Sequence, residues 1–140
     1  LGNEAVLLCH GDSLCTDDVA YQAFRKQVRN PAWQAQFLGQ PLAVRKQIIA
    51  GVRMKSEEAK SEKAAAIMDV NADAVAALFR GHGFAPLIHG HTHRPAEHRI
   101  VVDAQPCERW VLADWRENDG EASGEVLVWS EGLLQRQPLQ

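Results

Sequence analysis

Two short apolar runs that each pass directly into His-Gly constrain what this chain can fold into. The run AVLLC leads into HGD at residues 10–12, and FAPLI leads into HGHTHRP at residues 89–95. Neither run alternates polar with apolar residues, a pattern typical of strands covered on both faces. If the two strands are neighbours with matching ends, His10 is predicted to lie beside His91 and His93 at one edge of a sheet.

The segment between the two runs has helical patterning with recognisable start signals. Asp17 and Asp18 offer N-cap oxygens to a predicted helix over about 17–29. Asn-Pro at 30–31 ends that helix and begins a helical pattern over 31–54, interrupted near 39–41. Two further helices are predicted, one capped by Ser56 and running to about Met68, and one capped by Asn71 and closed by the glycines at 81 and 83.

After Pro95 the periodicity changes to two, which predicts a series of short strands. The last two, GEVLVWS and GLLQRQPL, flank Ser-Glu-Gly at 130–132 and are expected to form an antiparallel hairpin. Strand, helices, strand and then several strands predict an α/β chain.

Histidines at the ends of two strands favour a metal site. Imidazole suits Zn, Mn, Fe and Ni, while carboxylates and waters extend the choice towards harder ions such as Mn²⁺. In a strand-like loop, residues two apart point the same way, so His91 and His93 could each face an ion. His89 ends its strand, and we expect it to support the site by donating to a carbonyl or carboxylate rather than to bind metal. The competing interpretation for any single histidine is an ordinary hydrogen-bonded residue.

Charge and cysteine usage narrow the partners. Residues 19–63 carry nine Lys/Arg and three acids, or +6, while the rest of the chain is −9. This asymmetry indicates a face for anions, or only a solvated helical surface. The net charge of −3 points to no nucleic-acid partner. An apolar stripe from Trp33 to Val52 fits either lipid contact or helix packing.

Three cysteines match no disulfide framework and no CxxC pair, which favours a reducing compartment.

The motifs resemble a known superfamily. HGD after one strand and GHTH after a later one resemble the calcineurin-like metallophosphoesterases. Within them, CHGDSLCTDDVAYQAFRKQVRNP, AIMDVN and LIHGHTHRP are similar to the UDP-2,3-diacylglucosamine diphosphatases of lipid A biosynthesis, most strongly over residues 5–95. The resemblance implies the C-terminal part of an αββα sandwich with a helical insertion over about 19–68. The first-half motifs Asp-x-His, Gly-Asp and Gly-Asn-Arg/His are absent, so the missing N-terminal half is an expected partner.

The resemblance also implies chemistry and residue roles. It implies Mn²⁺-dependent hydrolysis of UDP-2,3-diacylglucosamine to UMP and 2,3-diacylglucosamine 1-phosphate by two ions. His10 and His91 would bind one ion and His93 the other, with His91 also catalytic and in contact with substrate. Four residues match substrate-binding positions, although Lys60 stands where the family often has asparagine: Asp18, Ser56, Lys60 and Lys63.

The same resemblance implies a peripheral protein on the cytoplasmic face of the bacterial inner membrane, bound to an anionic lipid surface. Two other functions remain open from the residues. One is a metallophosphoesterase acting on soluble phosphoesters, and the other is a non-catalytic metal-binding module. Taken alone, the chain is expected to be inactive, because three histidines divided between two ions fall short of a two-metal site.

Overall fold

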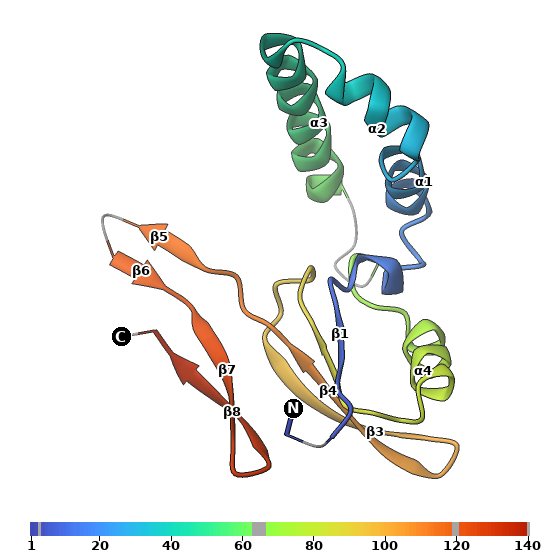
Figure 1. The fold of residues 1–140 in the computed structure, drawn as a ribbon, viewed down its shortest axis with the longest axis vertical. Helices are drawn as coiled ribbons and strands as arrows, with labels where there is room; N and C mark the ends of the chain where they lie inside the picture. The colour runs from blue at the N-terminus through green and yellow to red at the C-terminus, as the bar shows by residue number, and fades with distance from the viewer. Residues whose placement is uncertain (3, 63–66, 119–120, 140) are drawn as a thin grey trace. The chain divides into compact units, whose positions relative to one another are not determined.

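The computed structural model describes residues 1–2, 4–62, 67–118 and 121–139 of a mixed α/β chain (Figure 1). The chain divides into two compact units, one made of residues 1–14 and 70–140 and the other of residues 15–69. The predicted α/β class is confirmed. No helix in the described part of the chain is long and apolar enough to cross a membrane.

A mixed sheet organises the first unit. Its strands are β1 (Leu7–Cys9), β2 (Leu87–His89), β4 (Gln105–Val111) and β3 (Ala96–Val102), in that spatial order. The β1–β2 and β2–β4 pairs are parallel, and β3–β4 is antiparallel. Cys9 pairs with His89, and His89 pairs with Val111, so the three parallel strands end level with one another. The predicted adjacency of the two apolar strands is therefore confirmed.

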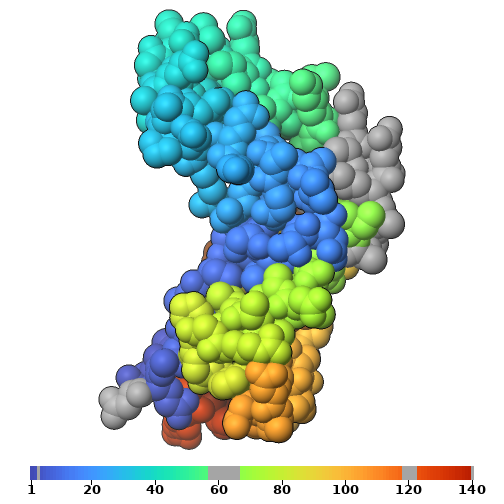
Figure 2. Space-filling model, turned by 90° about the vertical axis from the view of Figure 1, so that its right-hand side faces the viewer, coloured from blue at the N-terminus to red at the C-terminus, as the bar shows by residue number. Residues whose placement is uncertain are grey.

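Helix α4 (Ala72–Gly81) packs on one face of this sheet. The predicted cap is confirmed, because Oδ1 of Asn71 accepts a hydrogen bond from the Ala74 amide. Figure 2 shows the surface of α4 meeting that of the β3–β4 turn, where Arg80 donates two hydrogen bonds to Asp103. The core beneath the helix consists of Leu14, Val75, Phe79, Leu87, Val102 and Cys107.

A hairpin follows the sheet in the same unit, as predicted. Strands β7 (Glu125–Ser130) and β8 (Leu133–Pro138) pair antiparallel around the turn at 131–132. Arg136 of β8 donates to the backbone carbonyls of Ala96 at 2.6 Å and Val111 at 2.7 Å. Its guanidinium also pairs with Glu125 and lies 5.6 Å from the centre of the Trp110 ring. These contacts fasten the hairpin to the β3–β4 pair. A short ribbon of β5 (Arg116–Asn118) and β6 (Glu121–Ser123) was not expected from the sequence.

The second unit is helical. Helix α1 (Val19–Val28) is capped by Asp18, and α2 (Pro31–Leu38) begins at its proline, both as predicted. Asn30 caps α2. The prediction of a separate helix beginning at Ser56 is wrong, because α3 (Leu42–Glu62) runs through that position without a break. No glycine or proline occurs between Val52 and Glu62 to end the helix, and serine is tolerated within one.

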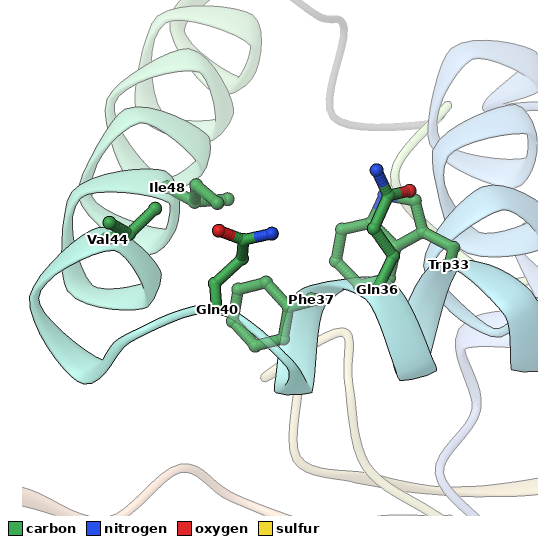
Figure 3. Close-up of a pocket in the computed structure, with 6 residues that line it drawn as sticks. All are labelled: Trp33, Gln36, Phe37, Gln40, Val44 and Ile48. Carbon is green, nitrogen blue, oxygen red and sulfur yellow. The ribbon is translucent and has the colours of Figure 1, made fainter.

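The apolar stripe of this unit is largely open. Leu38 is 62% exposed and Leu42 is 59% exposed. A groove of about 350 Å³ lies between α2 and α3, with Trp33 and Phe37 stacked at 5.2 Å along one wall (Figure 3). Val44 and Ile48 face it from α3. The stripe is therefore not a closed helix–helix core within the described residues.

Candidate metal centre

The level strand ends bring the two His-Gly loops into contact. The amide of Gly90 donates to the carbonyl oxygen of His10 at 3.1 Å. Gly11 has φ +101°, and a Cβ there would lie 2.8 Å from Nδ1 of His89 and 2.9 Å from the Gly90 carbonyl oxygen. Glycine is required because the backbone is left-handed and no side chain fits. Close backbone packing thus sets the spacing of the two loops.

His10 and His91 lie side by side at this edge. Their ring centres are 4.9 Å apart, with the ring planes at 56°. His10 is exposed, and its Nδ1 lies 3.3 Å from Oδ1 of Asp12, a carboxylate that is buried. This arrangement confirms the predicted neighbourhood of His10 and His91.

His93 occupies a different setting. Its Nδ1 lies 3.5 Å from Oδ2 of Asp114, a residue that follows β4. The Arg116 guanidinium hydrogen-bonded to Asp114 holds the pKa of that carboxyl below its usual range. The predicted placement of His93 beside His10 has no contact to support it, since Asp114 is the charged neighbour of His93 in the described structure.

The histidine loop is not extended, which corrects the reasoning used for its side chains. His91 has φ 69° and His93 has φ 53°, both left-handed values that are uncommon for residues other than glycine. The alternation of a strand therefore does not determine where these rings point. Such backbone conformations cost about 1–3 kcal/mol each and concentrate at functional sites.

His89 is fully buried and has both ring nitrogens engaged. Nδ1 lies 2.9 Å from the Gly90 carbonyl, and Nε2 lies 3.0 Å from a guanidinium nitrogen of Arg109. A carbonyl only accepts and a guanidinium only donates, so Nδ1 carries the proton and Nε2 accepts. His89 thus has no lone pair left for a metal ion, in line with its expected supporting role.

The donor chemistry fits a first-row divalent ion only in part. Imidazole nitrogens are suitable ligands for Mn²⁺ or Zn²⁺. Across residues 1–2, 4–62, 67–118 and 121–139, however, no three His, Cys, Asp or Glu side chains group closely enough to hold one ion. The cysteines are free and two are buried, and burial raises the pKa of the Cys9 thiol.

Apart from His91, the residues predicted to bind substrate belong to the second unit. Asp18 is buried and caps α1, accepting from the Tyr21 amide at 3.0 Å. Ser56 is exposed on α3, and Lys60 lies on the same helix. Lys63 lies outside the described residues.

Sequence reasoning missed three residues that hold the histidines. Asp12 lay unassigned within the HGD motif, and Arg109 and Asp114 lay unassigned within the series of short strands predicted after Pro95. An available signal for Asp114 was an acidic residue just after a buried strand, the same setting as HGD. The parallel pairing of β2 with β4, which brings Asp114 to His93, has no local signature.

Comparison with known proteins connects this geometry to a family. The chain is 66% identical over 116 residues to the UDP-2,3-diacylglucosamine hydrolase of Aromatoleum aromaticum, a match covering 83% of this chain and 47% of that protein. The chain is homologous to the UDP-2,3-diacylglucosamine hydrolases. The hydrolase of Chromohalobacter salexigens is 52% identical over 86% of this chain and 49% of its own length. That of Cellvibrio japonicus is 50% identical, over 86% and 52%.

The chain spans about half the length of these hydrolases. No protein-family model matches it. The resemblance carried by CHGDSLCTDDVAYQAFRKQVRNP, AIMDVN and LIHGHTHRP is confirmed by these homologues.

Proposed function

We propose that this chain is the C-terminal part of a Mn²⁺-dependent pyrophosphatase that cleaves UDP-2,3-diacylglucosamine to UMP and 2,3-diacylglucosamine 1-phosphate in lipid A biosynthesis. The observation that carries the proposal is the pairing of His10 with His91 at level strand ends, in a chain homologous to hydrolases of that name. In the complete protein, these strands belong to an αββα sandwich and the second unit is its helical insertion.

The proposed roles are those that the resemblance implies for each histidine. His10 and His91 would hold one ion and His93 the other, while the missing N-terminal half would supply the remaining ligands. When bound, the ions supply Lewis acidity towards the phosphoryl group and activate water. Asp12 orients the His10 ring, and His89 ties its loop to β4 through Arg109. His91 would also contact the substrate phosphate.

The open faces of the first unit support the need for a further half. Leu8 on β1 is 73% exposed and Val101 on β3 is 74% exposed, both on the edge strands of the sheet. Exposed apolar edge strands favour pairing with another chain segment. We assign that place to the N-terminal half of the same enzyme.

The activity test compares two histidines of one loop in the full-length protein. We expect His91→Ala to lose at least about 100-fold in UMP release with added Mn²⁺, because it removes an ion ligand and a substrate contact together. His89→Gln is the matched control, since glutamine can replace one of its two hydrogen bonds, and we expect a much smaller loss. Equal losses would refute the division of roles. Residues 1–140 alone are expected to release no UMP until the N-terminal half is added.

The groove and the charge of the second unit support a lipid-facing role. Acyl chains would occupy the groove lined by Trp33 and Phe37. The resemblance implies that Asp18, Ser56, Lys60 and Lys63 bind the rest of the substrate. We place the protein peripherally on the cytoplasmic face of the inner membrane. A generic phosphoesterase acting on soluble substrates would have no use for this open apolar groove.

Membrane binding can be measured by sedimentation with anionic phosphatidylglycerol vesicles. We expect binding that weakens as salt rises, because attraction between exposed charges is screened over about 8 Å at physiological ionic strength. Leu38→Ser should weaken binding without unfolding the protein, since that side chain is 62% exposed. Binding that changes neither with salt nor on Leu38→Ser would exclude the charged, apolar surface of the second unit as the membrane contact.

The incomplete ligand set favours one other candidate, a non-catalytic metal-binding module. Metal content separates it from the enzyme. The full-length enzyme should hold two Mn²⁺ ions per chain, whereas a module should hold at most one, weakly.

A further inference from the structure

We infer that Asp114 is the positioning residue for His93, fixing the ring so that Nε2 faces the metal. This inference rests on the proposed function, in which His93 binds an ion. It assigns a role to a residue that neither the motif resemblance nor the names of the relatives single out.

The placement of Asp114 follows from the sheet. Asp114 comes three residues after β4, and β4 lies parallel to β2, whose loop carries His93. Its Oδ2 lies 3.5 Å from Nδ1 of His93. The Asp114 side chain is 22% exposed, against 61% for His93. The Asp114 side chain is thus held by its surroundings, whereas the His93 ring is largely exposed and depends on Asp114 for its orientation.

Arg116 fixes the carboxylate from the other side. Its Nε donates to the same Oδ2 of Asp114 in a short, charge-assisted hydrogen bond. Paired with Arg116, Asp114 is an ionised carboxylate that only accepts, so a neutral His93 meets it as a donor through Nδ1. Arg116 and Asp114 together form a support that selects one tautomer of the ring.

The selected tautomer leaves Nε2 of His93 with its lone pair available. In the described residues, His93 has no interaction other than the one with Asp114. His10 repeats the arrangement, with Nδ1 towards Asp12 and no protein partner for Nε2 in the same range. His89 differs, because Arg109 occupies its Nε2. The two histidines proposed as ligands of different ions therefore share one orientation device, which the supporting histidine lacks.

The effect should be large because little else holds the His93 ring. It is 61% exposed on a loop residue with left-handed backbone, so few packing contacts restrict its rotamer. Removing a carboxylate that orients a metal-binding histidine typically weakens metal affinity 10–100-fold. We expect Asp114→Ala to fall within that range.

The test uses the full-length protein and two readouts. In the metal-free protein at mildly alkaline pH, ¹H–¹⁵N NMR reports the tautomer of His93. Wild type should show Nδ1 protonated, and Asp114→Ala should show a mixture of both tautomers. Mn²⁺ titration should then show affinity reduced 10–100-fold for one of two ions. Asp114→Asn retains an acceptor oxygen, so it should keep the tautomer and lose less affinity.

Asp103→Ala is the matched control. It also removes an aspartate hydrogen-bonded to an arginine, Arg80, in the same unit, but with no histidine beside it. It should change neither readout. Unchanged tautomer and affinity in Asp114→Ala, with a strong loss in His93→Ala, would overturn the inference and leave the proposed function standing. If His93→Ala also binds two ions as tightly as wild type, the proposed function itself fails.

Discussion

Replacing Gly11 by alanine tests whether close backbone packing sets the spacing of the two His-Gly loops. Two costs add at this position. At φ +101° an alanine pays for a backbone conformation that disfavours a side chain, about 1–3 kcal/mol. Its methyl group would also lie 2.8 Å from Nδ1 of His89 and 2.9 Å from the Gly90 carbonyl, and such overpacking costs a further 1–3 kcal/mol or so.

Gly132 separates the two costs. It has φ +80°, and an added Cβ there would meet nothing within 4 Å. Gly132→Ala therefore measures the backbone cost alone. The entropy that alanine removes from the unfolded chain is the same at both sites and cancels in the difference. The free energy of unfolding should fall by about 1–2 kcal/mol for Gly132→Ala and by roughly 1–3 kcal/mol more for Gly11→Ala.

Urea unfolding of the full-length variants provides the measurement, with the slope m as a check that the unfolded states are comparable. Equal losses for Gly11→Ala and Gly132→Ala would mean that the loops separate without cost. The contact between HGD and HGHTH would then not fix the distance between His10 and His91, and the reasoning would be refuted.

Three further predictions concern the scaffold of the first unit. Arg136→Ala should lower the free energy of unfolding by about 3 kcal/mol in urea melts, because two carbonyls lose their donor; Arg136→Lys should recover little, since lysine lacks the forked geometry. Asn71→Ala should cost about 1 kcal/mol in the same assay through loss of the α4 cap, and Asn71→Asp should restore it. Arg80→Gln should raise the pKa of Asp103 towards its ordinary 3.8, as followed by NMR titration. The Arg80–Asp103 pair stabilises the fold above that pH and stops doing so as pH falls through the lowered pKa. The free energies of unfolding of wild type and variant should therefore converge in acid.

Local signals predicted most of the elements. Asp18, Asn30 and Asn71 each precede a helix as caps, because their short side chains satisfy amides that the first turn leaves free. The hairpin at 125–138 followed from alternation around Ser-Glu-Gly. The helix start predicted at Ser56 was wrong because serine also occurs inside helices. Only a glycine or proline near Ser56 would have marked a helix boundary.

The candidate site was predictable only where two strands carry the same sequence signal. AVLLC and FAPLI end in the same dipeptide, so His10 and His91 could be placed together. Asp114 could not be placed beside them, because β4 has the pattern of one of several alternating strands. No local sequence feature indicates that β4 pairs parallel with β2. The left-handed backbone at His91 and His93 was equally hidden, since neither residue is glycine or asparagine.

The clamp formed by Arg136 has a consequence for synthesis on the ribosome. The carbonyls of Ala96 and Val111 accept hydrogen bonds from Arg136, which is translated 40 and 25 residues later, respectively. At about 5–20 residues per second, the face of the sheet around Trp110 stays uncovered for roughly 1–5 s after Val111 is made. In that interval the nascent strands present apolar surface and free backbone groups, the features that chaperones bind. Synthesis of the β7–β8 hairpin thus sets when this face is covered, and codons that slow translation between β4 and β8 would lengthen the exposure.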